Sequence, residues 1–194
     1  MRQFVTAAAL AVALMAQPAA ADAVLDGKAA AELGDYTRAV EIWRPLAEAG
    51  DPRAETYLGI MYDNGYGVRQ DRAEAFRWFE RAAGRGFANA QYHLGFMYQH
   101  GRGVQRSQTE ALELYRLAAA QGDPAAQYNL GRMYAHGLVV PRDLVEAHMW
   151  FELAARERTS IRPLASRDRK SLARQMTEDE VALAVERAEN WRPH

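Results

Sequence analysis

One nine-residue segment occurs three times in this chain, and each copy lies 36 residues after the one before. The copies begin at Ala54, Ala90 and Ala126, and each contains the pattern Leu-Gly-x-Met-Tyr. A second set of positions keeps the same step: Ala75, Ala111 and Ala147, the aromatic residues Phe79, Tyr115 and Phe151, and Ala83, Ala119 and Ala155. Repetition at a fixed step of about 20 to 50 residues is typical of stacked supersecondary units. The repeat therefore constrains the fold before composition is considered.

Each repeat contains two helix patterns separated by a loop. Ala54, Leu58 and Met61 are spaced to share one helix face. Gly-Asp-Pro sequences predict Asp51 and Asp123 as N-caps of first helices. The second helices begin with the pattern of a capping box, at Asp71-x-x-Glu74, Ser107-x-x-Glu110 and Asp143-x-x-Glu146. The first helices are predicted to end at a glycine with positive φ, namely Gly65, Gly101 and Gly137.

Two helices of this length cannot bury their apolar faces alone, whereas stacked neighbours can. The sequence therefore predicts an all-α fold, a right-handed superhelical α/α solenoid of antiparallel helix pairs with a C-terminal capping hairpin. The array is expected over 22–157, with a partial unit at 24–50 and complete units at 51–86, 87–122 and 123–157. The capping helices are expected within 158–194.

The C-terminal part departs from the period, because Arg158 stands where Gly86 and Gly122 stand in the earlier repeats. Helices are predicted at 161–175 and 178–191. Thr177 is the expected N-cap of the last helix, whose buried stripe is Val181, Val185, Ala188 and Trp191. An acidic cluster in the last helix is preceded by seven basic residues, namely Arg156, Arg158, Arg162, Arg167, Arg169, Lys170 and Arg174. Either the two helices neutralise each other, or the basic residues form a docking patch.

The first 21 residues have the order of a secretory signal peptide. Arg2 gives a positive start, an apolar run extends from Phe4 to Ala16, and small residues at 19–21 form a cleavage site. A second cleavage site ends at Ala23. We therefore expect an exported protein, periplasmic or secreted, with no integral membrane segment after cleavage.

In a repeat array, positions that differ between repeats are candidates for ligand contact. One such set, which we call the first-helix stripe, is spaced i, i+4, i+7 and i+11 on the first helices. It comprises Arg53, Tyr57, Ile60 and Asn64, then Asn89, His93, Phe96 and His100, then Ala125, Asn129, Arg132 and His136. If these helices line the inner curve, the stripe forms a concave groove for a protein or peptide. Otherwise Ile60 and Phe96 are ordinary packing or isolated surface residues.

Composition excludes several other classes of function. The formal net charge is −1, and basic residues do not alternate with aromatic ones along one face, so no nucleic acid partner is expected. The absence of cysteine excludes disulfides, thiol catalysis and cysteine-based metal sites. His100 and His136 occupy the same slot in neighbouring repeats, but no third ligand accompanies them. No metal and no other cofactor is therefore expected.

No group of residues has the pattern of a catalytic centre. None of the four serines lies in a nucleophile motif, and Ser107 is already predicted to cap a helix. We therefore expect no catalytic residue and no enzyme. The alternative is a small-molecule-binding or hydrolytic enzyme, of the β-lactamase or esterase type, that uses the same groove.

Residues 52–155 resemble the Sel-one-like repeat (SLR) family, a relative of the tetratricopeptide repeats. The resemblance rests on the Leu-Gly-x-Met-Tyr core, the loops ending at Val68 and Val104, and a closing Ala-Ala pair. The 36-residue step also differs from the tetratricopeptide step of about 34. Val139 departs from the pattern, because it replaces the second glycine of the third loop.

The resemblance implies a concave scaffold for protein–protein contacts. For an exported bacterial member it implies a role in envelope assembly, as a periplasmic regulator of signalling, or in host interaction. Cysteine-rich members are described as binding penicillin-like molecules. That property is not transferred to this chain, which lacks every cysteine.

Overall fold

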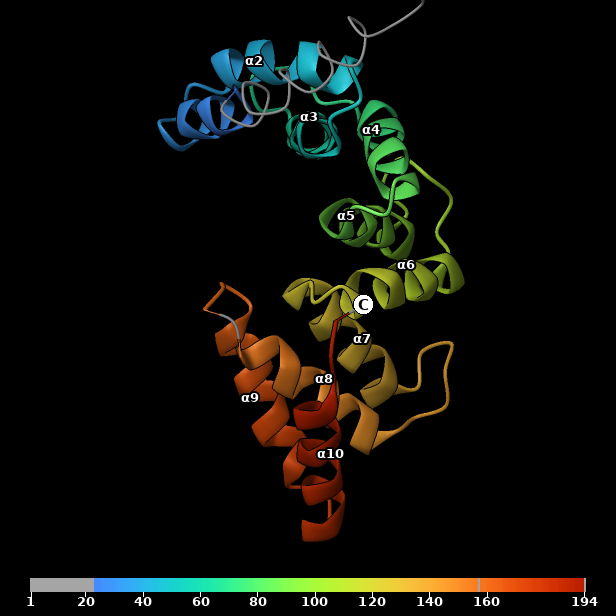
Figure 1. The fold of residues 1–194 in the computed structure, drawn as a ribbon. Coiled ribbons are helices and arrows are strands. Elements are labelled where there is room, and N and C mark those ends of the chain that lie inside the picture. Colours follow the sequence, from blue (N-terminus) through green and yellow to red (C-terminus); the bar gives the residue numbers. More distant parts are fainter. Residues whose placement is uncertain (1–22, 157, 194) are drawn as a thin grey trace, which may run out of the picture. The chain divides into compact units, whose positions relative to one another are not determined.

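A computed structural model describes residues 23–156 and 158–193, and every regular element in these ranges is a helix (Figure 1). The predicted all-α fold of consecutive helical repeats is thereby confirmed, while the predicted signal peptide lies outside the described residues. A helical segment at 23–32 precedes α2 (Tyr36–Glu48), α3 (Pro52–Asn64), α4 (Arg72–Gly84), α5 (Ala88–His100), α6 (Gln108–Ala120), α7 (Pro124–His136), α8 (Leu144–Arg156), α9 (Arg162–Ala173) and α10 (Glu178–Asn190).

The chain divides within α4 into two compact units, which we call the N-terminal unit, ending at Trp78, and the C-terminal unit, beginning at Phe79. None of the helices in the described ranges is long and apolar enough to cross a membrane.

The predicted ends of the first helices are confirmed. Asp51 caps α3 by accepting the N–H groups of Arg53 and Ala54, and Asp123 caps α7 by accepting that of Ala126. Helix α5 begins differently, because Phe87 occupies its N-cap position and provides no side-chain acceptor. All three helices end at the predicted glycine, with φ of 75° at Gly65, 66° at Gly101 and 66° at Gly137. This left-handed conformation turns the chain toward the second helix of each pair.

The second helices have the predicted N-caps but not the complete capping boxes. The side chains of Asp71, Ser107 and Asp143 accept the N–H group three residues later in each case. The carboxylates of Glu74 and Glu146, however, bind Arg77 and Arg187. The backbone N–H groups of Asp71, Ser107 and Asp143 donate instead to the carbonyls of Tyr62, Tyr98 and Tyr134, so no N-cap N–H remains for a glutamate. The box predicted at Thr177 and Glu180 is complete.

The core of the N-terminal unit is built around Trp43. Its side chain is almost fully buried, and its Nε1–H donates to the carbonyl of Val24 at 3.1 Å. A Cβ atom on Gly27 would lie 2.3 Å from the same Nε1, so only glycine lets the segment 23–32 approach the ring. The remaining core residues come from α2, α3 and α4: Ala39, Val40, Ala47, Ala54, Leu58, Met61 and Trp78.

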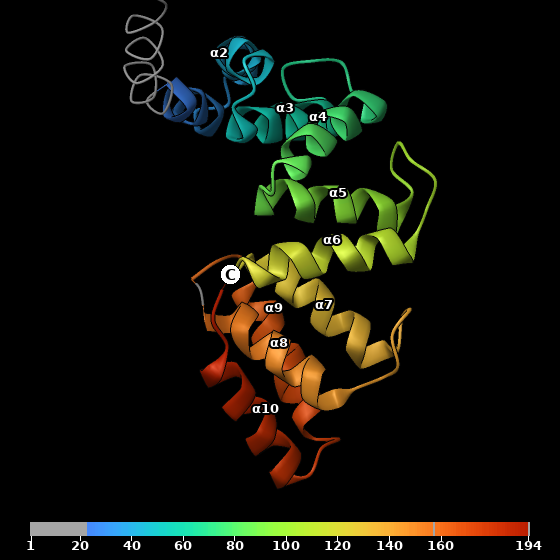
Figure 2. The same cartoon turned by 45° about the vertical axis from the view of Figure 1, so that its right-hand side comes forward.

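In the C-terminal unit, helices pack as antiparallel neighbours, α5 with α6 and α7 with α8 (Figure 2). The repeated glycine of each first helix permits this close approach. A Cβ on Gly131 would lie 2.8 Å from the ring of Phe151, and one on Gly95 would lie 3.0 Å from that of Tyr115. Both rings are almost fully buried. The aromatic repeat in the sequence therefore marks the seam of each helix pair.

The closing helices α9 and α10 both pack against α8 (Figure 2). Of the stripe predicted for α10, Ala188 is buried and Val181, Val185 and Trp191 are half-buried. Two charge pairs join the closing helices to α8: Arg169 binds Glu152, and Arg187 binds Glu146. Arg169, one of the seven basic residues, therefore has its partner on the last helix of the array.

The loop after α7 keeps its shape despite its departure from the repeat pattern. Gly67 and Gly103 have φ of 67° and 71°, and Val139 adopts φ of 66° at the same position. A β-branched residue in this left-handed region is strained. The surrounding turn therefore holds Val139 in a conformation that glycine would adopt freely.

Candidate ligand-binding face

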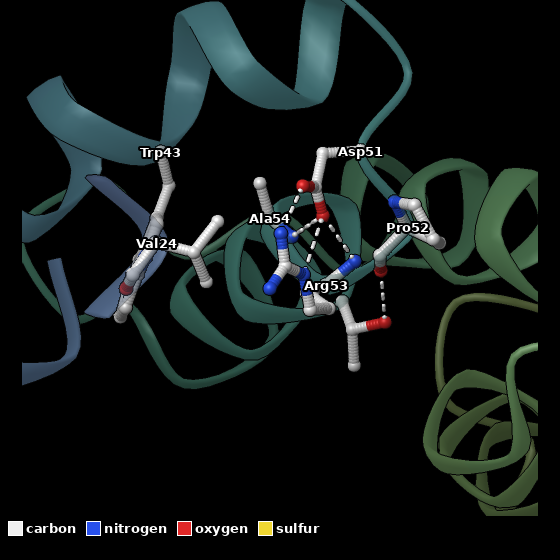
Figure 3. A network of polar contacts seen from close by, with 7 residues as sticks. Val24, Trp43, Asp51, Pro52, Arg53 and Ala54 are labelled. Atoms are coloured by element: carbon white, nitrogen blue, oxygen red, sulfur yellow. Dashed lines mark hydrogen bonds and ion pairs between the residues drawn. The ribbon is translucent and has the colours of Figure 1, made fainter. Parts of the chain in front are cut away.

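On α3, the first-helix stripe is largely used by the N-terminal unit itself. Arg53 turns back to its own N-cap, with Nη2 lying 2.7 Å from Oδ2 of Asp51 (Figure 3). The ring of Tyr57 stacks on Trp43, with centroids 4.5 Å apart and planes inclined by 13°. Ile60 packs against the same core cluster. Of the four stripe residues here, Asn64 alone is classed as exposed.

On α5, the stripe is divided between packing and exposure. Asn89 donates a hydrogen bond to Asp123, so its side chain links α5 to the N-cap of α7. His93 stacks on Phe79 with centroids 4.9 Å apart, and burial lowers the pKa of His93 to about 4. The imidazole is therefore neutral at pH 7 and acts as a packing group.

The other half of the α5 stripe reaches the surface. Phe96 is half-buried, and its ring centroid lies 4.1 Å from that of His100. The Arg102 guanidinium lies 5.7 Å from the Phe96 centroid, within range of a cation–π interaction. His100 is exposed, and its Nδ1 lies 2.9 Å from the Phe96 carbonyl. These three side chains present an aromatic and cationic patch.

On α7, two members of the stripe are exposed and two are half-buried. Asn129 is half-buried and donates to the carbonyl of Ala125 at 2.9 Å. Arg132 and His136, one helical turn apart, are both exposed. The guanidinium of Arg132 lies 5.9 Å from the centroid of the Tyr128 ring. This interaction orients the arginine without neutralising it.

Arg132 and His136 border a cavity of about 220 Å³ in the C-terminal unit. Helix α7 forms one wall and α9 forms the other, while Phe151 of α8 lies at its base. The α9 residues are spaced along one helix face: Asp168, Ser171, Leu172 and Gln175. Arg132 and His136 of the predicted stripe therefore line the same cavity as α9, a helix that was predicted only to cap the array.

Asp168 connects the two walls of this cavity, α7 and α9, by a hydrogen bond. Its carboxylate accepts the Tyr128 hydroxyl at 2.8 Å and pairs with Arg167 at 2.9 Å. Burial alone would raise the pKa of Asp168. The hydrogen bonds from Arg167 and Tyr128, with the charges of Arg167 and Arg132, outweigh burial and hold that pKa below its usual range. Asp168 is therefore ionised at neutral pH.

The α9 contribution was missed because the repeat does not extend to that helix. One signal was present in the sequence, since Asp168 is the only acidic residue between Arg158 and Thr177. Nearby basic residues favour the ionised form of such a carboxyl group. Tyr128, whose hydroxyl donates to Asp168, lies outside the predicted stripe.

Ser107 is engaged as the N-cap of α6. Within residues 23–156 and 158–193, no cluster of three or more His, Asp or Glu side chains has the geometry to hold a metal ion.

Comparison with known proteins agrees with the class of fold, an array of antiparallel helix pairs. The family profile described as Sel1 repeat matches residues 52–87, 88–123 and 124–158. These three matches cover more than half of the sequence, so the chain belongs to the Sel1 repeat family, as its resemblance to Sel-one-like repeats implied. No curated protein matches the chain.

Two solved structures are similar to this one. A Sel1 repeat protein from Oxalobacter formigenes has a TM-score of 0.71 and 34% identity, over 84% of this chain and 66% of that protein. A protective antigen present in uropathogenic Escherichia coli strains, which displays an SLR fold, has a TM-score of 0.59 and 28% identity. That match covers 79% of this chain and 40% of the antigen. The chain thus spans less than two thirds of either protein.

Proposed function

We propose that this protein is a non-catalytic scaffold that binds a protein or peptide through the exposed part of the first-helix stripe. In the C-terminal unit the proposed surface consists of the exposed His100, Arg132 and His136 and the half-buried Phe96. The observation that carries the proposal is the exposure of Arg132 and His136 beside a cavity, at repeat positions whose α3 counterparts are Ile60 and Asn64. Aromatic and arginine side chains are frequent anchors of protein interfaces.

An affinity capture from an envelope extract of the native host tests this proposal. The wild-type chain and a Phe96→Ala/Arg132→Ala variant are compared by quantitative mass spectrometry. A matched control changes Arg116 and Leu117 to Ala, because both are exposed on α6 and neither belongs to the stripe. We expect the stripe variant to lose a partner that the control retains. Equal recovery by all three chains would exclude the stripe as the binding surface.

We also propose that the protein is exported, to the periplasm or beyond it, and serves envelope assembly or the periplasmic regulation of signalling. The support is the signal-like order of residues 1–21. Side-chain burial bears on which cleavage site is used. Val24 is 3% exposed, and cleavage after Ala23 would place a charged α-amino group on it. We therefore expect cleavage after Ala21.

N-terminal sequencing of the protein recovered from separated periplasmic and cytoplasmic fractions tests both statements. The expected first residue is Asp22. A chain that begins at Val24 would contradict the burial argument, and a chain that begins at Met1 in the cytoplasm would contradict export.

A further inference from the structure

The cavity between α7, α8 and α9 combines an apolar base with a polar rim. At its base lie Phe151 and Leu172, whose side chains are 2% and 6% exposed. Arg132 and His136 line it from α7, and Ser171 and Gln175 line it from α9. A volume of about 220 Å³ accommodates one side chain or one chain terminus rather than a folded segment.

The two charged groups at the rim, Asp168 and Arg132, differ in how many polar partners they have. Asp168, the acidic member of the lining, already accepts from Tyr128 and pairs with Arg167. Arg132 makes no hydrogen bond or ion pair with another of the described residues, although its charge helps to lower the pKa of Asp168. A guanidinium has five N–H donors in a rigid fork. The cavity therefore offers an unused cation beside an acid that is already satisfied.

The polar group of Gln175 is oriented to donate. Its Oε1 accepts a hydrogen bond from Nη2 of Arg142 at 3.0 Å, and Nε of Arg142 also donates to the carbonyl of Ala135. Since the oxygen of Gln175 is engaged, the amide N–H groups are its remaining donors. Arg142 also adds positive charge beside the cavity. A ligand group that accepts several hydrogen bonds and carries negative charge is thus complementary to this rim.

We propose that this cavity binds a carboxylate of the partner peptide, with Arg132 as the principal contact and His136, Ser171 and Gln175 as further polar contacts. The inference rests on the proposed function and specifies the chemistry of the partner. The carboxylate comes from an Asp or Glu side chain or from a C-terminus. A phosphate dianion fits less well, because the ionised Asp168 lies in the same lining and would repel its second charge.

The test uses fluorescence anisotropy with four pools of randomised hexapeptides that carry the same neutral dye. The pools differ only in one fixed residue and in the C-terminus: Glu with an amide, Gln with an amide, Gln with a free carboxylate, and phosphoserine with an amide. We expect one of the two carboxylate pools to bind at least about 10-fold more tightly than the Gln-amide pool. Which of the two binds identifies the source of the carboxylate.

Variants assign this preference to the cavity. Arg132→Gln should abolish it, and Arg132→Lys should retain part of it, because lysine keeps the charge but loses the fork. Arg116→Gln, which changes an exposed arginine on α6, should leave the preference intact. Thermal melts should be nearly unchanged in all three variants, since both arginines are exposed.

Several results would overturn the proposal. These are equal affinity for the carboxylate and Gln-amide pools, strongest binding of the phosphoserine pool, or a carboxylate preference that survives in Arg132→Gln. If the Gln-amide pool binds without any carboxylate preference and Phe96→Ala weakens it, the proposed function stands and the carboxylate site fails. If no pool binds, both fail.

Discussion

Helices α3 and α7 are built from the same repeat pattern, yet the residues at their stripe positions differ in burial and in contacts. In α3, Tyr57 stacks on Trp43 and Ile60 packs against the core. In α7, the equivalent residues are Asn129 and Arg132, of which the first is half-buried and the second is exposed. The period is the same in both helices, but the side chains around each helix are not.

The difference shows that a repeat pattern identifies a helix face without deciding whether that face is free. Neighbouring elements decide it. The helical segment 23–32 and α2 supply Trp43 and the groups around it in the N-terminal unit. In the C-terminal unit, α9 approaches α7 through Tyr128 and Asp168 and leaves a cavity beside Arg132. Binding capacity is therefore expected where the stripe borders α9.

The largest expected effect is on stability and separates the two helices directly. Tyr57→Ala removes a half-buried ring stacked on Trp43 and should lower the free energy of unfolding by about 3 kcal/mol. Asn129→Ala, at the equivalent position of α7, should lower it by less than about 1 kcal/mol. Urea unfolding followed by circular dichroism measures both. Equal losses would show that the two positions are alike and break the comparison.

His93, the α5 counterpart of Tyr57, should make stability depend on pH. Its pKa is about 4 in the folded chain and 6.5 when unperturbed, so the unfolded state takes up the proton first as pH falls. Stability contributed by the neutral imidazole is full above pH 6.5 and declines toward pH 4, by about 2 to 3 kcal/mol in total.

His93→Phe keeps a stacked ring on Phe79 but cannot be protonated. The difference in unfolding free energy between wild type and variant, measured in urea at several pH values, should therefore change across this range. Carboxylates such as Asp123 are present in both chains and cancel from the difference. A difference that stays constant from pH 7 to pH 4 would show that His93 is not buried as a neutral group.

The loops that follow the first helices allow a smaller test. Val139→Gly should relieve the strain of a β-branched residue at φ of 66° and raise the unfolding free energy by up to about 1 kcal/mol. The converse change, Gly103→Val, should lower it by more than about 1 kcal/mol, because it introduces the same strain. Thermal unfolding of the two variants measures these changes. A destabilised Val139→Gly chain would mean that the valine contributes more by contact than it costs in strain.

The smallest expected effect on stability belongs to the exposed end of the α7 stripe. Arg132→Ala and His136→Ala should each change the unfolding free energy by less than about 0.5 kcal/mol. The same changes should weaken partner binding. A loss of several kcal/mol in stability would instead place these side chains in the packing of the unit, as Tyr57 is in α3.

The repeat itself made much of the fold predictable. Helix starts at Asp51 and Asp123 and helix ends at Gly65, Gly101 and Gly137 follow from local chemistry that is visible in the sequence. The stripe was less predictable, because exposure depends on contacts between residues far apart in the chain. Trp43 lies 14 residues before Tyr57, and Asp168 lies 40 residues after Tyr128. Neither pairing obeys the 36-residue step.

The most direct test of the account places a photo-crosslinking residue, p-benzoylphenylalanine, at one position at a time. The test positions are Phe96 and Arg132 on the stripe, and the control position is Leu117, which is 53% exposed on α6. We expect crosslinked adducts with a partner from positions 96 and 132 and none from position 117. Adducts from position 117 alone, or equal yields from all three, would contradict the claim that the exposed stripe of α5 and α7 is the binding surface.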